Sequence, residues 1–261
     1  MRIGDILDGR YEVRRLWRRV FLVLDLSTGR HSVARPADGF ASAEAVEALR
    51  EVVHPSLPRV FGEIEVAGCR HVLFEYLPGS DLETLVRRSG GVLTAASAAT
   101  IVLAVAHTVA FLHECLDRPL VHLDIKPEHV ILSGGVPCLI DFSSAVLLSR
   151  DSGAGMGDSV REATPAYAAP EMSVWRGPCV QSDIYSLGVT LFCVLGGALP
   201  VSGHLPDLRD LPENDVPGSL RAVVGRCLMA DPAARFSTMS ELAAALAAVS
   251  GSGGMSIASR I

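Results

Sequence analysis

The sequence predicts an α+β protein with two lobes, in which a small β-rich lobe precedes a larger helical one. The first 75 residues contain short apolar and β-branched segments separated by turn residues, which is typical of strands. After residue 79, longer apolar segments of helical length follow, chiefly 95–113 and 184–201. A chain of 261 residues is also long enough to form two lobes that share one cleft.

Local patterns place each element of the small lobe. Strands are expected at 11–13, 20–24, 31–34, 60–66 and 71–74. The last two strands are joined by a turn at Ala67 and Gly68, so they form a hairpin. A helix is expected at 41–53, with Ser42 as its cap. The small lobe is therefore expected to be a sheet with one helix.

The large lobe is expected to be helical. Its helices are expected to start near 81, 95, 184 and 241. Segment 184–201 is nearly uncharged and just long enough to span a membrane. Asp183 at its expected cap and a break at Gly196 favour a buried helix over a membrane span. His113 is expected to be a capping or surface group. Residues 250–261 start with Gly and Ser residues and are expected to form a flexible tail.

Charge and cysteine usage limit the partners and the compartment. A net charge of −6 and a pI near 5.7 argue against a protein that binds nucleic acid or an anionic membrane with its whole surface. The six cysteines form neither a CxxC pair nor a zinc pattern, and most lie in apolar segments, which favours buried reduced thiols. The N-terminus has no signal-peptide pattern, so we expect a cytoplasmic protein.

The groups most suited to chemistry lie at 121–143. Two short apolar segments flank Gly134 and Gly135, a dipeptide suited to the positive φ angles of a tight hairpin. Asp124 precedes the hairpin, Asp141 follows it, and Lys126 projects to the same side of an extended chain as Asp124. The hairpin therefore brings two carboxylates and one ammonium group to one end. Such a group suits phosphoryl transfer, in which one carboxylate orients a hydroxyl, another holds a metal ion and a cation neutralises charge.

Several motifs in this region resemble those of the Ser/Thr protein kinase family, in its compact bacterial form. HLDIKPEHV at 122–130 is similar to the catalytic loop H-R-D-x-K-P-x-N, and DFS at 141–143 is similar to the metal-binding D-F-G. APE at 169–171 resembles the end of an activation segment. SDIYSLG at 182–188 resembles the start of the central helix of the family.

The resemblance covers about residues 10–249. It implies a small lobe at about 10–75 and a large lobe at about 79–249, with ATP and Mg²⁺ as cofactors of an active member. It also implies that the partner or substrate is a protein. Within the large lobe, the resemblance implies a buried ion pair between Glu171 and Arg235.

The resemblance assigns three residues to catalysis and metal binding. Asp124 matches the catalytic base, and Lys126 matches the lysine that contacts phosphate. Asp141 matches the aspartate that binds magnesium. These three residues form the part of the site that orients the hydroxyl and holds the first metal ion.

Four further residues are assigned to the cofactor, and two of them depart from the family pattern. Glu75 and Leu77 match the hinge, whose backbone could meet an adenine. Arg35 stands where the family has a lysine that grips phosphate, and its planar fork is not equivalent to an ammonium group. His129 stands where a second metal-binding asparagine belongs, although imidazole suits zinc or manganese better than magnesium.

In this family, a glycine-rich loop between the first two strands covers the nucleotide phosphates, and we call this loop the roof. The roof of this chain also departs from the family pattern. Residues 16–20 contain no glycine, and the connection between the first two strands is about four residues shorter than in the family. The glutamate that should pair with the strand lysine falls near Ala45, although a one-residue slip in register would place Glu44 there. Nucleotide binding is therefore expected to be impaired.

The catalytic residues match the family pattern, whereas the nucleotide-binding residues depart from it. Two main functions are compatible with this combination. The leading hypothesis is a pseudokinase that acts through protein contacts. The alternative is a weakly active, ATP-dependent Ser/Thr protein kinase that uses Asp124 as base and Asp141 for Mg²⁺, with Arg35 replacing the lysine. The transfer of another phosphate-derived group on the same fold is a third, minor possibility.

Overall fold

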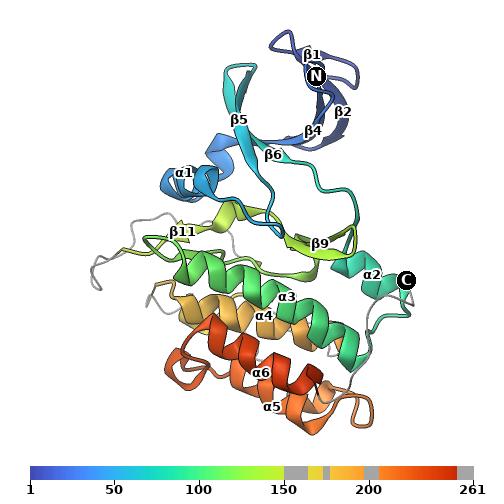
Figure 1. The fold of residues 1–261 in the computed structure, drawn as a ribbon, viewed down its shortest axis with the longest axis vertical. Coiled ribbons are helices and arrows are strands. Elements are labelled where there is room, and N and C mark those ends of the chain that lie inside the picture. The colour runs from blue at the N-terminus through green and yellow to red at the C-terminus, as the bar shows by residue number, and fades with distance from the viewer. Residues whose placement is uncertain (150–163, 173–176, 197–205, 252–261) are drawn as a thin grey trace.

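The structure, a computed structural model, describes residues 1–149, 164–172, 177–196 and 206–251. A sheet built from the N-terminal strands lies at one end of the molecule, and a group of packed helices lies at the other (Figure 1). The short strands β9 and β11 and the helix α1 lie between them (Figure 1). The α+β, two-lobed fold class predicted from the sequence is therefore confirmed.

The small lobe is a six-stranded sheet in which all neighbouring strands are antiparallel. Across the sheet the strands are β1 (Ile6–Leu7), β2 (Tyr11–Trp17), β3 (Val20–Asp25), β4 (His31–Pro36), β6 (Cys69–Glu75) and β5 (Val60–Val66). One face buries a small apolar cluster that includes Val13, Phe21 and Val23. Each strand predicted in this lobe is present, and β1 is an additional edge strand.

Helix α1 (Ala43–Glu51) is the only α-helix among the described residues of the small lobe. Ser42 caps it as predicted, because its Oγ accepts a hydrogen bond from the Ala45 N–H at 3.2 Å. Just before the helix, the Ala41 N–H donates to the Ser143 carbonyl at 2.7 Å. The start of α1 is therefore fastened to the segment that follows the central hairpin.

The described part of the large lobe packs five α-helices around a common apolar core. They are α2 (Leu82–Arg88), α3 (Ala95–Glu114), α4 (Val180–Val194), α5 (Gly218–Cys227) and α6 (Met239–Gly251). Helix α4 is buried along nearly all of its length, as predicted for the apolar segment that starts at Ile184. The helices α3, α5 and α6 pack against it (Figure 1).

One helix of the described chain, α3, is long and apolar enough to cross a membrane by length and composition. More than half of its 18-residue window is buried inside the protein (56%). Its buried residues belong to the same core as those of α4. The contacts of α3 are thus those of a core helix.

The predicted central hairpin is present at the boundary between the lobes. It consists of β9 (Val130–Ser133) and β10 (Val136–Leu139), joined by two glycines in the left-handed region, Gly134 at φ 58° and Gly135 at φ 84°. Two further short pairs surround it: β7 (Ser80–Asp81) adds to β9, and β8 (Leu120–Val121) pairs with β11 (Val146–Leu147). The hairpin holds its two flanking loops at one end, as the sequence predicted.

The predicted burial of the cysteines is only partly right. All six thiols are free, and Cys138 and Cys227 are buried. Cys69 and Cys115 are exposed, because the first lies beside the β5–β6 turn at the start of β6 and the second follows the end of α3. Of the predicted tail, residues 252–261 lie outside the described residues, as does the end of the apolar segment beyond residue 196.

The segment that joins the lobes packs closely at Gly79. A Cβ atom on Gly79 would lie 2.2 Å from the Leu132 carbonyl oxygen of β9. We expect Gly79→Ala to lower the free energy of unfolding by about 2 kcal/mol or more, since the backbone has to move to relieve the clash. Urea denaturation measures this loss. Gly39→Ala is the matched control, because a Cβ there meets no atom within 4 Å and should change stability little.

Candidate functional site

The turn over the cleft is a two-residue connection. Strands β2 and β3 pair as far as Trp17 and Val20, so only Arg18 and Arg19 form the loop, and Arg18 takes a positive φ of 52°. Arg19 donates to both carboxylate oxygens of Asp38 at 2.8 Å. The short, glycine-free roof predicted from the sequence is therefore present, and one of its arginines is already paired.

Arg35 on β4 forms a two-pronged ion pair with Asp141, which follows the central hairpin. Its Nη1 and Nη2 atoms each lie 2.6 Å from one carboxylate oxygen of Asp141. The side chains are 24% and 14% exposed, so solvent screens the pair only weakly. Both oxygens that a metal ion would need thus face a guanidinium group.

The backbone and the environment of Asp141 both favour this ion pair. Asp141 has a left-handed φ of 65°, and its Oδ1 also accepts a weak hydrogen bond from the Ser143 N–H at 3.3 Å. Burial alone would raise the pKa of Asp141, but the Arg35 and His129 side chains outweigh it and hold the pKa at about 2. The carboxylate is therefore ionised at any physiological pH.

The catalytic-loop residues form a second, connected group. Lys126 Nζ lies 3.1 Å from Asp124 Oδ2 and donates to Thr164 Oγ1 at 2.6 Å. The Thr164 N–H donates to Asp124 Oδ1 at 2.9 Å. Burial would raise the pKa of Asp124, yet His129, Thr164 and Lys126 together lower it. The structure thus brings together Asp124 and Lys126, which the sequence analysis paired.

His129 lies between the two carboxylates. Its Nδ1–H donates to the Asp124 carbonyl at 2.8 Å, and since a carbonyl can only accept, the proton is on Nδ1. Its Nε2 lies 3.4 Å from Asp141 Oδ2. Burial lowers the pKa of His129 to about 4 despite the attraction of both carboxylates, so the ring is neutral at pH 7.

The regulatory-helix glutamate does not reach the strand arginine. Glu44 on α1 pairs with Arg118 at 2.7 Å, and Arg118 also donates to the carbonyls of Leu147 and Leu148 beside β11. Ala45, the position at which the family's glutamate was expected, is buried and uncharged. The one-residue slip that would have let Glu44 pair with Arg35 is absent, so Arg35 is left to Asp141.

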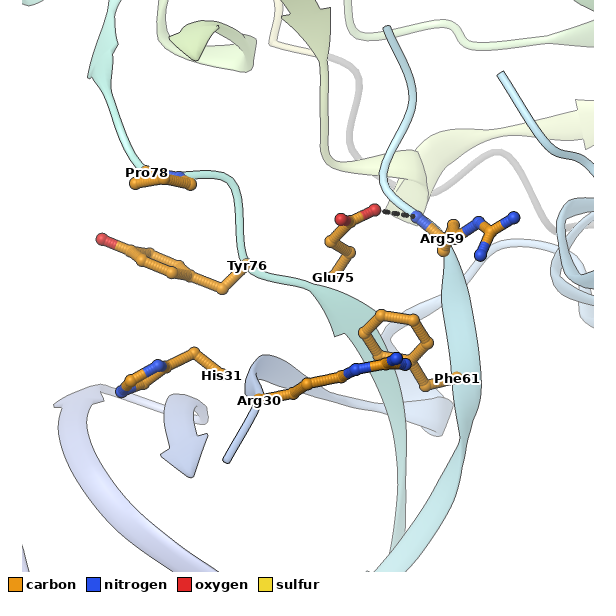
Figure 2. Close-up of a pocket in the computed structure, with 7 residues that line it drawn as sticks. All are labelled: Arg30, His31, Arg59, Phe61, Glu75, Tyr76 and Pro78. Atoms are coloured by element: carbon orange, nitrogen blue, oxygen red, sulfur yellow. Dashed lines mark hydrogen bonds between the residues drawn. The ribbon is translucent and has the colours of Figure 1, made fainter. Parts of the chain in front are cut away.

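The two hinge residues assigned to the nucleotide lie at the end of β6 and just beyond it. The Glu75 N–H donates to the Arg59 carbonyl at 2.7 Å, and its side chain accepts from the Arg59 N–H at 3.2 Å. Figure 2 shows the Glu75 side chain directed at Arg59. Leu77 is half-buried in the link to β7. Their contact with an adenine stays a prediction.

The group that supports the catalytic loop was not predicted from the sequence. Asp183, expected as a cap, is fully buried on α4, whose N-cap is Cys179. Its carboxylate accepts from the N–H groups of His122 and Leu123 at 2.8 Å and from His113 Nε2–H at 2.9 Å. His113 is therefore a buried partner and not a surface group. No local pattern predicts this contact, because it joins α3, α4 and the catalytic loop.

As arranged, the cleft does not fit a magnesium–nucleotide complex. Magnesium requires oxygen ligands in near-octahedral geometry, whereas both Asp141 oxygens face Arg35 and the neighbouring ligand position offers the His129 nitrogen. Within the described ranges, no three or more His, Cys, Asp or Glu side chains are grouped to hold a metal ion. The roof also lacks the glycines that would let main-chain N–H groups approach phosphate.

The two-lobed fold with this loop and hairpin defines a protein-kinase-like domain. A family model described as protein kinase domain matches residues 37–246, and the chain belongs to this family. The match begins directly after β4, so the four strands that carry the roof and Arg35 lie outside it.

Curated relatives extend the similarity to Ser/Thr protein kinases. The chain is 31% identical to serine/threonine-protein kinase pkn2 of Myxococcus xanthus, over 93% of this chain and 33% of that protein. It is 31% identical to serine/threonine-protein kinase PknG of Mycobacterium leprae, over 94% of this chain and 34% of that protein. Serine/threonine-protein kinase PknJ of Mycobacterium tuberculosis is 32% identical over 75% of the chain. The chain thus spans about a third of the length of these relatives.

Proposed function

We propose that this protein kinase domain is a pseudokinase, impaired in nucleotide binding, that acts by contacting other proteins. The observation that carries the proposal is the two-pronged ion pair between Arg35 and Asp141. A metal ion would have to displace a guanidinium from both oxygens before it could bind Asp141. The ion pair is only partly exposed to water, so its loss has a free-energy cost that metal binding must overcome.

The reaction of this family depends on positioning, which the cleft supports poorly. Phosphoryl transfer is catalysed mainly by holding the phosphates and stabilising their charge. The roof is a two-residue turn, and the strand cation that would hold the phosphates is engaged elsewhere. A correctly oriented base adds little when the nucleotide beside it is loosely held.

The second candidate is a weakly active Ser/Thr kinase, and one observation favours it. Asp124, Lys126 and Thr164 are joined by short hydrogen bonds and contacts, as a working catalytic loop requires. In this case the Arg35–Asp141 pair would open when ATP and Mg²⁺ bind. The protein would then need an exchange of partners at Asp141 during every catalytic cycle.

A titration with ATP and Mg²⁺ separates the two functions. A ligand at one hundred times its Kd stabilises a fold by about 2.7 kcal/mol, which corresponds to a rise in Tm of about 5–10 °C for a domain of this size. We expect no rise at 1 mM ATP with 10 mM MgCl₂ and no transfer of labelled phosphate to the chain or to a generic protein substrate. A clear rise in Tm, with phosphate transfer that Asp124→Asn abolishes, would establish the kinase.

The role of Arg35 can be tested with the metal alone. We expect Arg35→Ala to strengthen Mn²⁺ binding, measured by electron paramagnetic resonance, at least tenfold, because both Asp141 oxygens become free. Arg10→Ala is the matched control, since it breaks a similar two-pronged pair with Asp25 on the sheet. It should leave the Mn²⁺ affinity unchanged, because Asp25 still accepts hydrogen bonds from Ser27 and Thr28. Equal Mn²⁺ affinity in the wild type and Arg35→Ala would contradict the idea that this pair blocks the metal site.

A further inference from the structure

A cavity of about 600 Å³ lies beside the hinge, and none of the catalytic-loop residues lines it. Its lining residues come from the β3–β4 turn, from β4, from the start of β5 and from the hinge: Arg30, His31, Arg59, Phe61, Glu75, Tyr76 and Pro78. Figure 2 shows the rings of His31 and Tyr76 on one side of this hollow and Arg30 beside Phe61 on the other. We call it the hinge cavity.

The turn that presents Arg30 is held by a buried carboxylate. Asp25, only 6% exposed, accepts hydrogen bonds from the Ser27 N–H and Oγ–H and from the Thr28 Oγ1–H, at 2.7 to 2.9 Å. Arg10 adds a two-pronged ion pair to the same carboxylate. The backbone that carries Arg30 is therefore held in place before any ligand binds, which lowers the entropy cost of binding.

A bulge in the sheet turns an aromatic ring towards the hinge cavity. The pairing of β5 with β6 shifts register between Val60 and Gly62, and Gly62 takes a φ of 143°. Such a bulge redirects a side chain. The residue between them, Phe61, is 40% exposed, and the Arg30 guanidinium lies 5.9 Å from its ring centroid. An aromatic ring is thus kept at the surface beside a cation.

The two arginines of the hinge cavity have no acidic partner among the described residues. Six of the nine other arginines in the small lobe pair with carboxylates: Arg10, Arg14, Arg19, Arg35, Arg50 and Arg70. The carboxylate inside the cavity, Glu75, is turned to the Arg59 N–H. Arg30 and Arg59 are both exposed residues, so their charge is available to a partner.

We propose that the hinge cavity binds an acidic peptide segment of a partner protein. Carboxylates of the segment would pair with Arg30 and Arg59, and an apolar or aromatic side chain would lie between Phe61 and Tyr76. Arginine and aromatic residues are the usual anchors of protein contacts, and opposite charges guide the approach. This inference rests on the proposed function and names the partner chemistry for its protein contacts. The hinge cavity shares only Glu75 with the residues assigned to the nucleotide and metal.

Selection from a random library of 12-residue peptides tests the proposal with the whole chain. We expect the selected peptides to carry at least two Asp or Glu residues beside an apolar residue. Their Kd, measured by fluorescence anisotropy, should rise at least tenfold for the double variant Arg30→Gln/Arg59→Gln and for Phe61→Ala. It should also rise at least threefold between 50 and 300 mM NaCl, because the contacts are ionic.

Arg70→Gln is the matched control, since Arg70 is an exposed arginine of the same lobe outside the hinge cavity, and it should leave the Kd unchanged. The proposal is overturned if the selected peptides lack acidic residues, if the variants bind them equally well, or if 10 mM inorganic phosphate displaces them fully. Self-association that the double variant abolishes would make a second copy the occupant and would also overturn it. Peptide binding that depends on Arg30 would still support the acidic-peptide site if the ATP titration showed an active kinase. Each experiment can therefore contradict its own proposal without deciding the other.

Discussion

Replacing Arg235 with methionine should lower the free energy of unfolding by about 3–5 kcal/mol, the usual cost of breaking a buried ion pair from one side. Arg235 is 1% exposed and Glu171 is 2% exposed. Each terminal nitrogen of Arg235 donates to one oxygen of Glu171, at 2.8 and 2.7 Å. The variant keeps the volume of the side chain but leaves the Glu171 charge buried without its partner.

The loss extends beyond the ion pair. Arg235 also donates to the carbonyls of Met229, Gln181 and Ala230, which tie the end of α5 and the start of α4 to the same guanidinium. These carbonyls lose a partner in the variant, and an unsatisfied buried acceptor costs about 1–3 kcal/mol. We therefore place the expected loss towards the upper end of the range.

Urea denaturation at pH 7 measures this loss, and two further variants interpret it. Arg209→Met removes an exposed arginine that pairs with Asp207, so it should change stability by less than about 1 kcal/mol. Glu171→Leu combined with Arg235→Met removes both charges and should cost less than the two single changes added together. If Arg235→Met unfolds at the wild-type urea concentration, the pair does not stabilise the large lobe.

Much of the architecture could be predicted because it depends on short stretches of sequence. The strands of the small lobe, the Ser42 cap and the Gly134–Gly135 turn each follow from residues within one element. The Glu171–Arg235 pair was also predicted, although the two residues lie far apart, because the family resemblance carried it. Local pattern and family likeness together therefore account for the fold.

The contacts that decide the chemistry could not be predicted in the same way. Arg35 and Asp141 are 106 positions apart, and their pairing depends on how the sheet, α1 and the central hairpin come together. The sequence predicted that Arg35 replaces a lysine but not which carboxylate it contacts. The deciding tertiary fact is that Glu44 pairs with Arg118. Because the next residue is an alanine, α1 has no other carboxylate at this position for Arg35.

The missed contacts in the large lobe have the same cause. Asp183 is four residues into α4, where the sequence suggested a cap, yet tertiary packing makes it the acceptor for two N–H groups of the catalytic loop. One of these N–H groups belongs to Leu123, which has a positive φ of 65°. A strained residue in a loop requires a firm partner elsewhere in the fold, and only the structure identifies that partner.

The buried imidazole at the centre of the cleft should make the protein sensitive to acid. His129 is neutral in the folded chain because burial lowers its pKa to about 4, whereas an unfolded histidine has a pKa of about 6.5. Between these values the unfolded chain binds a proton that the folded chain does not. Stability therefore falls as the pH drops from about 6.5 towards 4, by about 2–3 kcal/mol from this residue.

His129→Asn should remove this part of the acid sensitivity. Asparagine has no titrating group, and its amide can still donate to the Asp124 carbonyl. Urea denaturation at pH 7.0 and pH 4.5 gives the change in unfolding free energy for each protein. We expect the wild type to lose about 2–3 kcal/mol more than the variant between these two values. Acid sensitivity below about pH 4 should persist in both, because Asp141 has a pKa of about 2 in the folded chain but an unfolded aspartate has a pKa of about 3.9, so the unfolded chain binds this proton first.

His107→Asn is the control, since His107 is an exposed histidine on α3 and its replacement leaves the cleft unchanged. It should retain the full wild-type loss between pH 7.0 and 4.5. His54, whose pKa is lowered by burial, contributes equally in all three proteins and cancels in the comparison. An equal loss in His129→Asn and the wild type would mean that folding does not change the pKa of His129, and would contradict the prediction. A smaller loss in the wild type than in the variant would mean that His129 is protonated in the folded protein and bridges Asp124 and Asp141 as a cation.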